Sequence, residues 1–273
     1  MKLLTQFNDL LTNDESVAHL KGLLVRHCSI LLCVSSQDAN PIYFRQLLSG
    51  QDFGADNMVA RQMVNFAYLI GDKSTGECVI VDPAYAVQEI VSIAESDGMK
   101  VTGVLASHYH ADHVGGSMMG HTIEGVAALL ETHHVPIHVN VHEAPWVTRT
   151  TGISESDLVV HEAGDVIMVG NLPITCIHTP GHTPGSQCFL TAGCLVSGDT
   201  LFLEGCGRTD LPGSDVGQMY ESLTTLASLP DDTIVLPGHR YSEAPAGRMA
   251  EVKEYNYVFK PRSREQWMMM FGH

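Results

Sequence analysis

The stretch Ser107-His108-Tyr109-His110-Ala111-Asp112-His113 follows directly on the apolar, β-branched segment 101–105. It places four side chains that can bind a metal within six positions, at the end of a predicted strand. His108 and His110 can point the same way as the chain leaves the strand, whereas His113 must turn elsewhere if a helix begins there. One short loop can therefore serve two adjacent metal ions.

Three further side chains can complete such a site, because a tetrahedral metal takes three or four protein ligands. Each follows a short β-type run and a glycine: His182 within 179–185, Asp199 after 194–198, and His239 after 233–238. Taken singly, a histidine or aspartate after glycine is more often a loop residue or a helix cap. Their occurrence together with the first run, all at predicted strand ends, favours a metal centre.

Five other histidines have no partner at ligand spacing and are interpreted as surface or packed groups: His133, His134, His138, His142 and His161. His121, a few residues past the metal loop, is kept as a candidate to hydrogen-bond a ligand. Cys206 lies between two glycines and is interpreted as a small packed residue in a tight loop.

The sequence resembles the metallo-β-lactamase-fold hydrolase superfamily, from about Tyr43 to Met270, in seven residues: His108, His110, Asp112, His113, His182, Asp199 and His239. The resemblance implies that His108, His110 and His182 bind one metal. It implies that Asp112, His113 and His239 bind the other, with Asp199 bridging both. The family's fold, a four-layer αββα sandwich of the α/β (α+β) class, is the expected architecture.

A paired site of this kind polarises a carbonyl and lowers the pKa of a bridging water, so hydroxide forms without a strong protein base. Asp112 can also accept a hydrogen bond from that hydroxide and orient it, which makes it the expected catalytic side chain. The sequence thus predicts a metal-dependent hydrolase with two Zn²⁺.

Segments 198–202 and 205–208 resemble the glyoxalase II (hydroxyacylglutathione hydrolase) and persulfide dioxygenase branches of the superfamily. Zinc β-lactamases of the commonest type carry Cys where Asp199 stands, and flavodiiron relatives carry Glu where His110 stands. RNA-processing relatives share the ligands, but this chain has 15 Lys and Arg against 31 Asp and Glu. A net charge of −16 with no basic patch disfavours binding to a phosphate backbone, so no nucleic acid partner is expected.

Three functions remain open. The first is glyoxalase II-like hydrolysis of a small thioester or related ester. The second is a persulfide (sulfur) dioxygenase with a single Fe²⁺ on His108, His182 and Asp199, a branch that segments 43–47 and 205–210 also resemble. About thirty residues follow Tyr241, too few for the C-terminal helical domain of long glyoxalase II enzymes. The third is a non-catalytic binding module, which is disfavoured because such relatives usually lose ligands.

Arg208, Arg240 and Tyr241 are expected at the rim of the site, where they would bind the carboxylates of a substrate such as a glutathione conjugate. The alternative is local pairing of Arg208 with Asp210 and of Arg240 with Glu243. Residues 117–165 match neither branch.

The predicted organisation is a catalytic domain over 41–273 and a helical N-terminal extension over 1–40. No run of about 18 apolar residues predicts a membrane span. Seven scattered cysteines are typical of a reducing compartment, here the cytoplasm, with an organellar matrix as the alternative and a homo-oligomer left open. Strands are expected at 77–83, 101–106, 135–139, 165–169, 172–178, 186–191, 194–198 and 233–236, and helices at 87–94, 123–130, 144–150 and 215–228.

Overall fold

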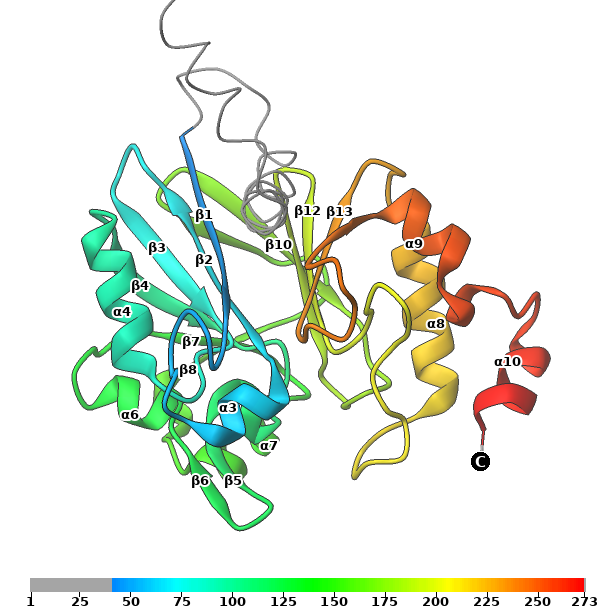
Figure 1. Cartoon of the computed structure of the whole chain (residues 1–273), viewed down its shortest axis with the longest axis horizontal. Coiled ribbons are helices and arrows are strands. Elements are labelled where there is room, and N and C mark those ends of the chain that lie inside the picture. Colours follow the sequence, from blue (N-terminus) through cyan, green and yellow to red (C-terminus); the bar gives the residue numbers. More distant parts are fainter. Residues whose placement is uncertain (1–40, 273) are drawn as a thin grey trace, which may run out of the picture. The chain divides into compact units, whose positions relative to one another are not determined.

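The computed structural model describes residues 41–272, in which two six-stranded sheets lie face to face (Figure 1). The helical extension expected at 1–40 lies outside the described residues. The first sheet has the spatial order β1-β2-β3-β4-β7-β8, with bounds Ile42–Leu48, Phe66–Asp72, Glu77–Val81, Lys100–Leu105, Ile137–Asn140 and Leu158–His161. The second has the order β14-β13-β12-β11-β10-β9, with bounds Gly247–Arg248, Ile234–Pro237, Cys194–Gly198, Gln187–Thr191, Leu172–His178 and Val166–Val169.

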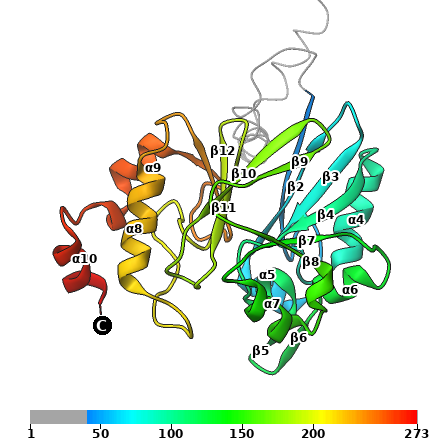
Figure 2. The same ribbon diagram turned by 180° about the vertical axis from the view of Figure 1, so that it is seen from behind.

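Helices cover the outer face of each sheet, as the two opposite views show (Figures 1 and 2). α4 (Val87–Ser96) and α6 (Val126–Leu130) lie against the first sheet, and α8 (Val216–Ala227) and α9 (Met249–Tyr255) against the second. The remaining helices are α3 (Met58–Met63), α5 (Ala111–Val114), α7 (Ala144–Thr151), α10 (Arg264–Phe271) and the 3₁₀ turns Glu155–Asp157 and Tyr257–Phe259. The predicted four-layer αββα sandwich is confirmed. None of the described helices is both long and apolar enough to cross a membrane.

Two of the outer helices, α4 and α8, each bury one apolar stripe, as the spacing of their apolar residues requires. On α4 the stripe is Val87, Ile90, Val91 and Ala94, all buried against the first sheet. On α8 it includes Met219, Leu223 and Leu226, buried against Leu195 and Val235 of the second sheet. Full burial of each large aliphatic side chain contributes about 1.5–3 kcal/mol. These stripes fix the helices on the sheets, and they confirm the helices predicted at 87–94 and 215–228.

Parallel strand pairs bring the predicted ligands to one edge of each sheet. β4 is parallel to β3 and β7, and β12 is parallel to β13, so the chain leaves these strands in a common direction within each sheet. The Tyr68 hydroxyl of β2 donates a hydrogen bond to the Pro237 carbonyl at the end of β13, at 2.6 Å. The carboxyl ends of these strands in the two sheets therefore lie next to each other.

The segment 117–165 differs from the predictions in two places. The helix expected over 123–130 begins only at Val126, because Ile123 ends strand β6 (His121–Ile123) and pairs with Gly116 of β5 (Gly116–Met118). A Cβ on Gly125 would lie 2.2 Å from the Val114 carbonyl oxygen, so only glycine fits where this hairpin meets the helix. Strand β8, parallel to β7, was not predicted.

Candidate metal centre

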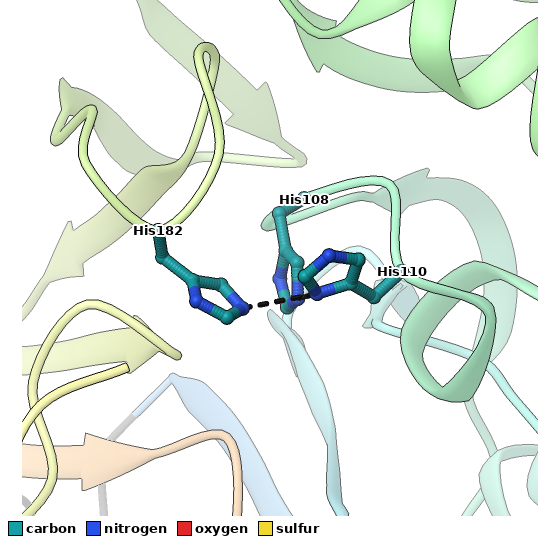
Figure 3. Close-up of side chains that lie close together, drawn as sticks. All are labelled: His108, His110 and His182. Atoms are coloured by element: carbon teal, nitrogen blue, oxygen red, sulfur yellow. Dashed lines mark hydrogen bonds between the residues drawn. The ribbon is translucent and has the colours of Figure 1, made fainter. Parts of the chain in front are cut away.

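Three imidazoles from two loops converge on one point (Figure 3). His108 and His110 follow β4, and His182 lies in the loop between β10 and β11. The Nδ1 atom of His110 is 3.0 Å from His108 Nε2 and 3.0 Å from His182 Nε2. The three donor atoms lie within 4.8 Å of one another, close enough to surround a single ion.

The far nitrogens of two of these rings are held by fixed partners, which sets the ring nitrogen that faces the cluster. The Arg208 carbonyl, 2.8 Å away, can only accept, so His182 Nδ1 carries the hydrogen. Ser107 Oγ donates to Asp82 Oδ2 at 2.6 Å and accepts from His108 Nδ1 at 2.9 Å. The Nε2 lone pairs of both rings therefore point inward. Such partners orient metal-binding histidines and increase their basicity.

Burial favours the neutral, metal-binding form of the imidazoles in the first set. Burial lowers the pKa of His108 well below its usual value. Burial, with the neighbouring His182, lowers the pKa of His110 to about 4. The inward lone pairs of His108 and His182, beside His110 Nδ1, favour a cation between the three rings.

A second set of donors lies beside the first and consists of Asp112, His113 and His239. The Nε2 atoms of His113 and His239 are 3.2 Å apart, and Asp112 Oδ2 is 3.6 Å and 3.4 Å from them. Here too the outer nitrogens are held: His113 Nδ1 donates to Asp82 Oδ2 at 2.9 Å, and His239 Nδ1 to the Met63 carbonyl at 2.7 Å. The inner nitrogens of both rings, Nε2, face Asp112.

Asp199 lies between the two sets. Its Oδ1 is 3.4 Å from His113 Nε2, and its Oδ2 is 3.3 Å from His239 Nε2 and 3.7 Å from His182 Nε2. Within residues 41–272, Oδ1 is buried and has no hydrogen-bond partner. A buried carboxylate oxygen without a partner is costly, so this atom fits a bound cation.

Without an ion, the buried carboxylates favour protons on the neighbouring imidazoles. Burial opposes a charge on His113, but the carboxylates of Asp199, Asp112 and Asp82 raise its pKa to about 10. Burial likewise opposes the charge on Asp199, but His239 and His113 hold its pKa well below the usual value. A divalent cation would replace these protons as the compensating charge.

Sequence reasoning missed three buried polar residues that organise the ligands. Asp82 follows β3 and binds Ser107 and His113, and Asn65 precedes β2 and faces the second set. Glu143, at the start of α7, accepts hydrogen bonds from the backbone N–H groups of Tyr109 at 2.6 Å and Gly185 at 2.7 Å. Of the three, only Asp82 had a signal in the sequence, because it is a carboxylate at the end of a predicted strand, before Pro83. The candidate His121 is exposed and does not line the site.

A cavity of about 750 Å³ opens on the metal centre and is lined by five of the seven predicted ligands: His110, Asp112, His182, Asp199 and His239. Its other walls include methionine and aromatic side chains, namely Met63, Met118, Met119, Tyr109, Phe202, Tyr241 and Tyr257. Cys206 also lines it, and burial raises the pKa of that thiol to about 12, so the sulfur is not a thiolate at neutral pH.

The three predicted substrate-binding residues occupy different positions. Arg208 lines the cavity but donates from Nε and Nη2 to the Asp210 carboxylate at 2.9 Å and 2.8 Å, with both residues exposed. Tyr241 lines the cavity and stacks on His239, with ring centroids 4.7 Å apart. Arg240 is not among the lining residues, and its guanidinium approaches the Glu243 carbonyl at 3.5 Å rather than that residue's carboxylate.

Comparison with known proteins gives a consistent family. Residues 61–239 match the family described as the metallo-β-lactamase superfamily. A hydroxyacylglutathione hydrolase of Rhodospirillum rubrum is 33% identical over 203 residues, which are 74% of this chain and 72% of that relative. A probable polyketide biosynthesis zinc-dependent hydrolase of Bacillus velezensis is 29% identical over 205 residues, 75% of this chain and 85% of that relative.

Solved structures give the same fold. ETHE1 from Myxococcus xanthus has a TM-score of 0.68 and 30% identity, covering 85% of this chain and 90% of that one. TTHA1623 in a di-iron-bound form has a TM-score of 0.58 and 27% identity, covering 72% of this chain and 96% of that one.

Proposed function

Because the chain belongs to the metallo-β-lactamase superfamily, we propose that it is a hydrolase that cleaves a small thioester or related ester with hydroxide activated by two metal ions. The observation that carries the proposal is the arrangement of two adjoining donor sets around Asp199, whose buried Oδ1 has no hydrogen-bond partner in the described part of the chain. Asp199 would be the carboxylate shared by the two sets.

The proposed assignment follows the two sets. His108, His110 and His182 would hold one ion, Asp112, His113 and His239 the other, and Asp199 both. When bound, the ions would polarise a substrate carbonyl and bring the pKa of a water between them toward neutrality. Zn²⁺ is the proposed metal because imidazole and carboxylate are its usual ligands and because relatives are named as zinc-dependent hydrolases.

The protein's own residues would place the substrate and the water. Asp112 lines the cavity, and its Oδ2 already accepts one hydrogen bond from Asn65, so the carboxylate can also accept one from the attacking water and hold its proton. Met63, Met118 and Tyr241 give the cavity apolar walls, which would bind the acyl or thiol part of the substrate and exclude further water.

A glutathione-linked thioester is the proposed substrate, on the strength of the similarity to hydroxyacylglutathione hydrolases. Arg208 would bind one of its carboxylates, since a guanidinium has five N–H donors and Asp210 engages only two of its nitrogens. Tyr241 would contact the substrate at the cavity wall, and Arg240 would act at long range from outside it. A cytoplasmic location and a homo-oligomer are proposed with it, and cell fractionation and light scattering test them.

The decisive experiment combines metal analysis with an activity assay. Protein purified without added metal should hold about two zinc ions per chain and release thiol from a glutathione thioester. One iron per chain together with oxygen uptake on a glutathione persulfide, without thioester hydrolysis, would reject the hydrolase proposal.

That outcome would favour the second candidate, a persulfide dioxygenase with one Fe²⁺ on His108, His182 and Asp199. The similarity to ETHE1 from Myxococcus xanthus, at 30% identity over 85% of this chain, is the observation that supports it.

A further inference from the structure

Asn65 is a buried residue that points into the second donor set. It lies one residue before β2 and pairs with His239 in an isolated β-bridge. Its Nδ2 atom is 3.1 Å from Asp112 Oδ2, 3.3 Å from His113 Nε2 and 3.4 Å from His239 Nε2. One amide nitrogen thus faces Asp112, His113 and His239, three of the four predicted ligands of the second ion.

These four atoms have the spacing of a metal's coordination shell. The three ligand atoms are 3.2 to 3.6 Å from one another, and Nδ2 is 3.1 to 3.4 Å from each. Donor atoms placed tetrahedrally at about 2.0–2.1 Å from an ion lie about 3.3–3.4 Å apart. The end of the Asn65 side chain therefore occupies one corner of the polyhedron that would enclose the second ion.

The amide nitrogen suits this corner only without an ion. His113 and His239 give their outer N–H groups to Asp82 and to the Met63 carbonyl, and Asp112 Oδ2 accepts a hydrogen bond from Asn65 Nδ2. An ion bound by Asp112 and by the inner nitrogens of the two rings would leave the Asn65 N–H groups facing a positive charge. The other end of a carboxamide is an oxygen, which is an acceptor and a metal ligand.

Tyr85 can hold Asn65 in either orientation. Its hydroxyl donates to Asn65 Oδ1 at 3.0 Å, and a phenol hydroxyl can equally accept from Nδ2. Tyr85 is buried and has φ of 73°, in the left-handed region that a bulky residue rarely adopts. Its N–H donates to the Glu124 carbonyl at 2.7 Å. Strain of this kind persists where the surrounding structure requires the side chain in one place.

We propose that Asn65 is a reversible ligand of the second ion: its carboxamide turns over when the ion binds, so that Oδ1 faces the metal and Nδ2 donates to Tyr85. Asn65 then sets the affinity for the second ion and decides whether the centre holds one ion or two. The inference rests on the metal centre of the proposed function, but not on its substrate.

The test is a stepwise metal titration of metal-free protein against a chromophoric chelator, with no activity assay. The variants are Asn65→Ala, Asn65→Asp and Tyr85→Phe, with Asn140→Ala as a control for the loss of a buried asparagine whose Oδ1 accepts from the backbone N–H of His142. Asn65→Ala should leave the first ion's affinity within about twofold and weaken the second about ten- to a hundredfold. Tyr85→Phe should weaken the second ion less, and Asn140→Ala neither.

The Asn65→Asp variant distinguishes a role of this side chain as a metal ligand from a role as a hydrogen-bond donor. A carboxylate keeps an oxygen for the ion but has no N–H, and it would repel Asp112 in the metal-free protein, so second-ion affinity should return to the wild-type value or exceed it. Visible absorbance of the protein with two Co²⁺ should return with it. The inference is overturned if Asn65→Asp binds the second ion as weakly as Asn65→Ala, if both ions weaken equally, or if wild-type protein never takes a second ion. Failure to hydrolyse thioesters would reject the proposed function and leave these affinities unchanged.

Discussion

Asp199 is the residue on which the charge balance of the metal centre depends. Its carboxylate lies 3.3 to 3.7 Å from imidazole nitrogens of His113 on α5, of His182 in the loop between β10 and β11, and of His239 after β13. A Cβ on Gly238 would lie 2.3 Å from Asp199 Oδ1, so the backbone there packs directly against the carboxylate. A shared anionic ligand in a fixed position is needed to hold two like-charged ions close together.

Replacement of Asp199 by Ala is expected to lose metal and at least about a hundredfold in hydrolysis rate, because the second ion would be absent or misplaced. Metal content and thiol release measure the two effects, and Asp199→Asn should repeat them without changing side-chain size. Asp232→Ala, which removes an exposed carboxylate, is the control. Near-normal turnover by a fully metallated Asp199 variant would leave this aspartate with a turn-forming role only.

Arg208→Ala is expected to raise KM roughly tenfold for a glutathione thioester with kcat unchanged, since a contact made equally in ground and transition states acts as uniform binding. The KM of a neutral thioester should not change, which makes that substrate the matched control. The pair with Asp210 is fully exposed, so its loss should leave the melting temperature near that of the wild type. A variant that unfolds more readily but keeps KM would assign Arg208 to the local ion pair instead.

At the scale of elements, the start of α7 ties two ligand loops together. Glu143 is fully buried and accepts from Tyr109, between two histidine ligands, and from Gly185, in the loop of His182. A Cβ on Gly185 would lie 2.3 Å from the Glu143 nitrogen, so the loop can approach this closely only with glycine there. Trp146 of the same helix stacks on Tyr109, with ring centroids 5.0 Å apart. The segment without a clear family match thus supports the centre from outside.

Burial raises the pKa of Glu143 to about 7, although hydrogen bonds from Thr183 and from the backbone at Tyr109 and Gly185 oppose the rise. The folded protein therefore binds this proton more tightly than the unfolded chain, so its contribution to stability is present at pH 4.5 and is lost as pH rises through about 7. Relative to Glu143→Gln, metal-free wild-type protein should lose up to about 3 kcal/mol between pH 5 and pH 8 in urea unfolding. A difference between the two proteins that does not change with pH would contradict this prediction.

Local sequence pattern predicted some of the elements, although not the strands β1 and β2. The periodic stripe of α4 and the β-rich runs of β10 and β12 were predicted close to their observed bounds. β8 was missed because Val159 and Val160 are both exposed at the edge of its sheet, so no alternation marks the strand. The helix at 123–130 was started too early because a three-residue strand, paired only to β5, has too few residues to show a period.

The sequence could mark seven side chains as candidate ligands because each follows a strand and a recognisable turn, and the structure brings all seven close together. Asn65 and Asp82 could not, because their approach to the ligands depends on how strands far apart in the chain pack side by side. Asn65 contacts His239 across 174 positions, and Asp82 contacts His113 across 31. A single asparagine or aspartate forms no periodic sequence pattern from which such contacts could be predicted.

At the scale of the whole molecule, metal removal should destabilise the sandwich, because each proposed ion binds residues from both sheets. A ligand present at a hundred times its Kd stabilises the folded state by about 2.7 kcal/mol. For a domain of this size, that corresponds to a fall in melting temperature on the order of 5–10 °C when a chelator removes one ion. Calorimetry before and after chelation measures the fall, and returning zinc should reverse it. An unchanged melting temperature after complete metal removal would contradict the prediction.

Because the ligands are divided between the two sheets, the protein can bind both proposed ions only at a late stage of its synthesis. The first sheet carries His108, His110, Asp112 and His113, and the ligands that complete both sets come later in the chain, ending with His239 after β13. A nascent chain released only as far as the first sheet has at most two ligands for each proposed ion. We therefore expect stable binding of both ions only after β13 has left the ribosome. Occupancy of both proposed sites would then show that the second sheet has packed against the first.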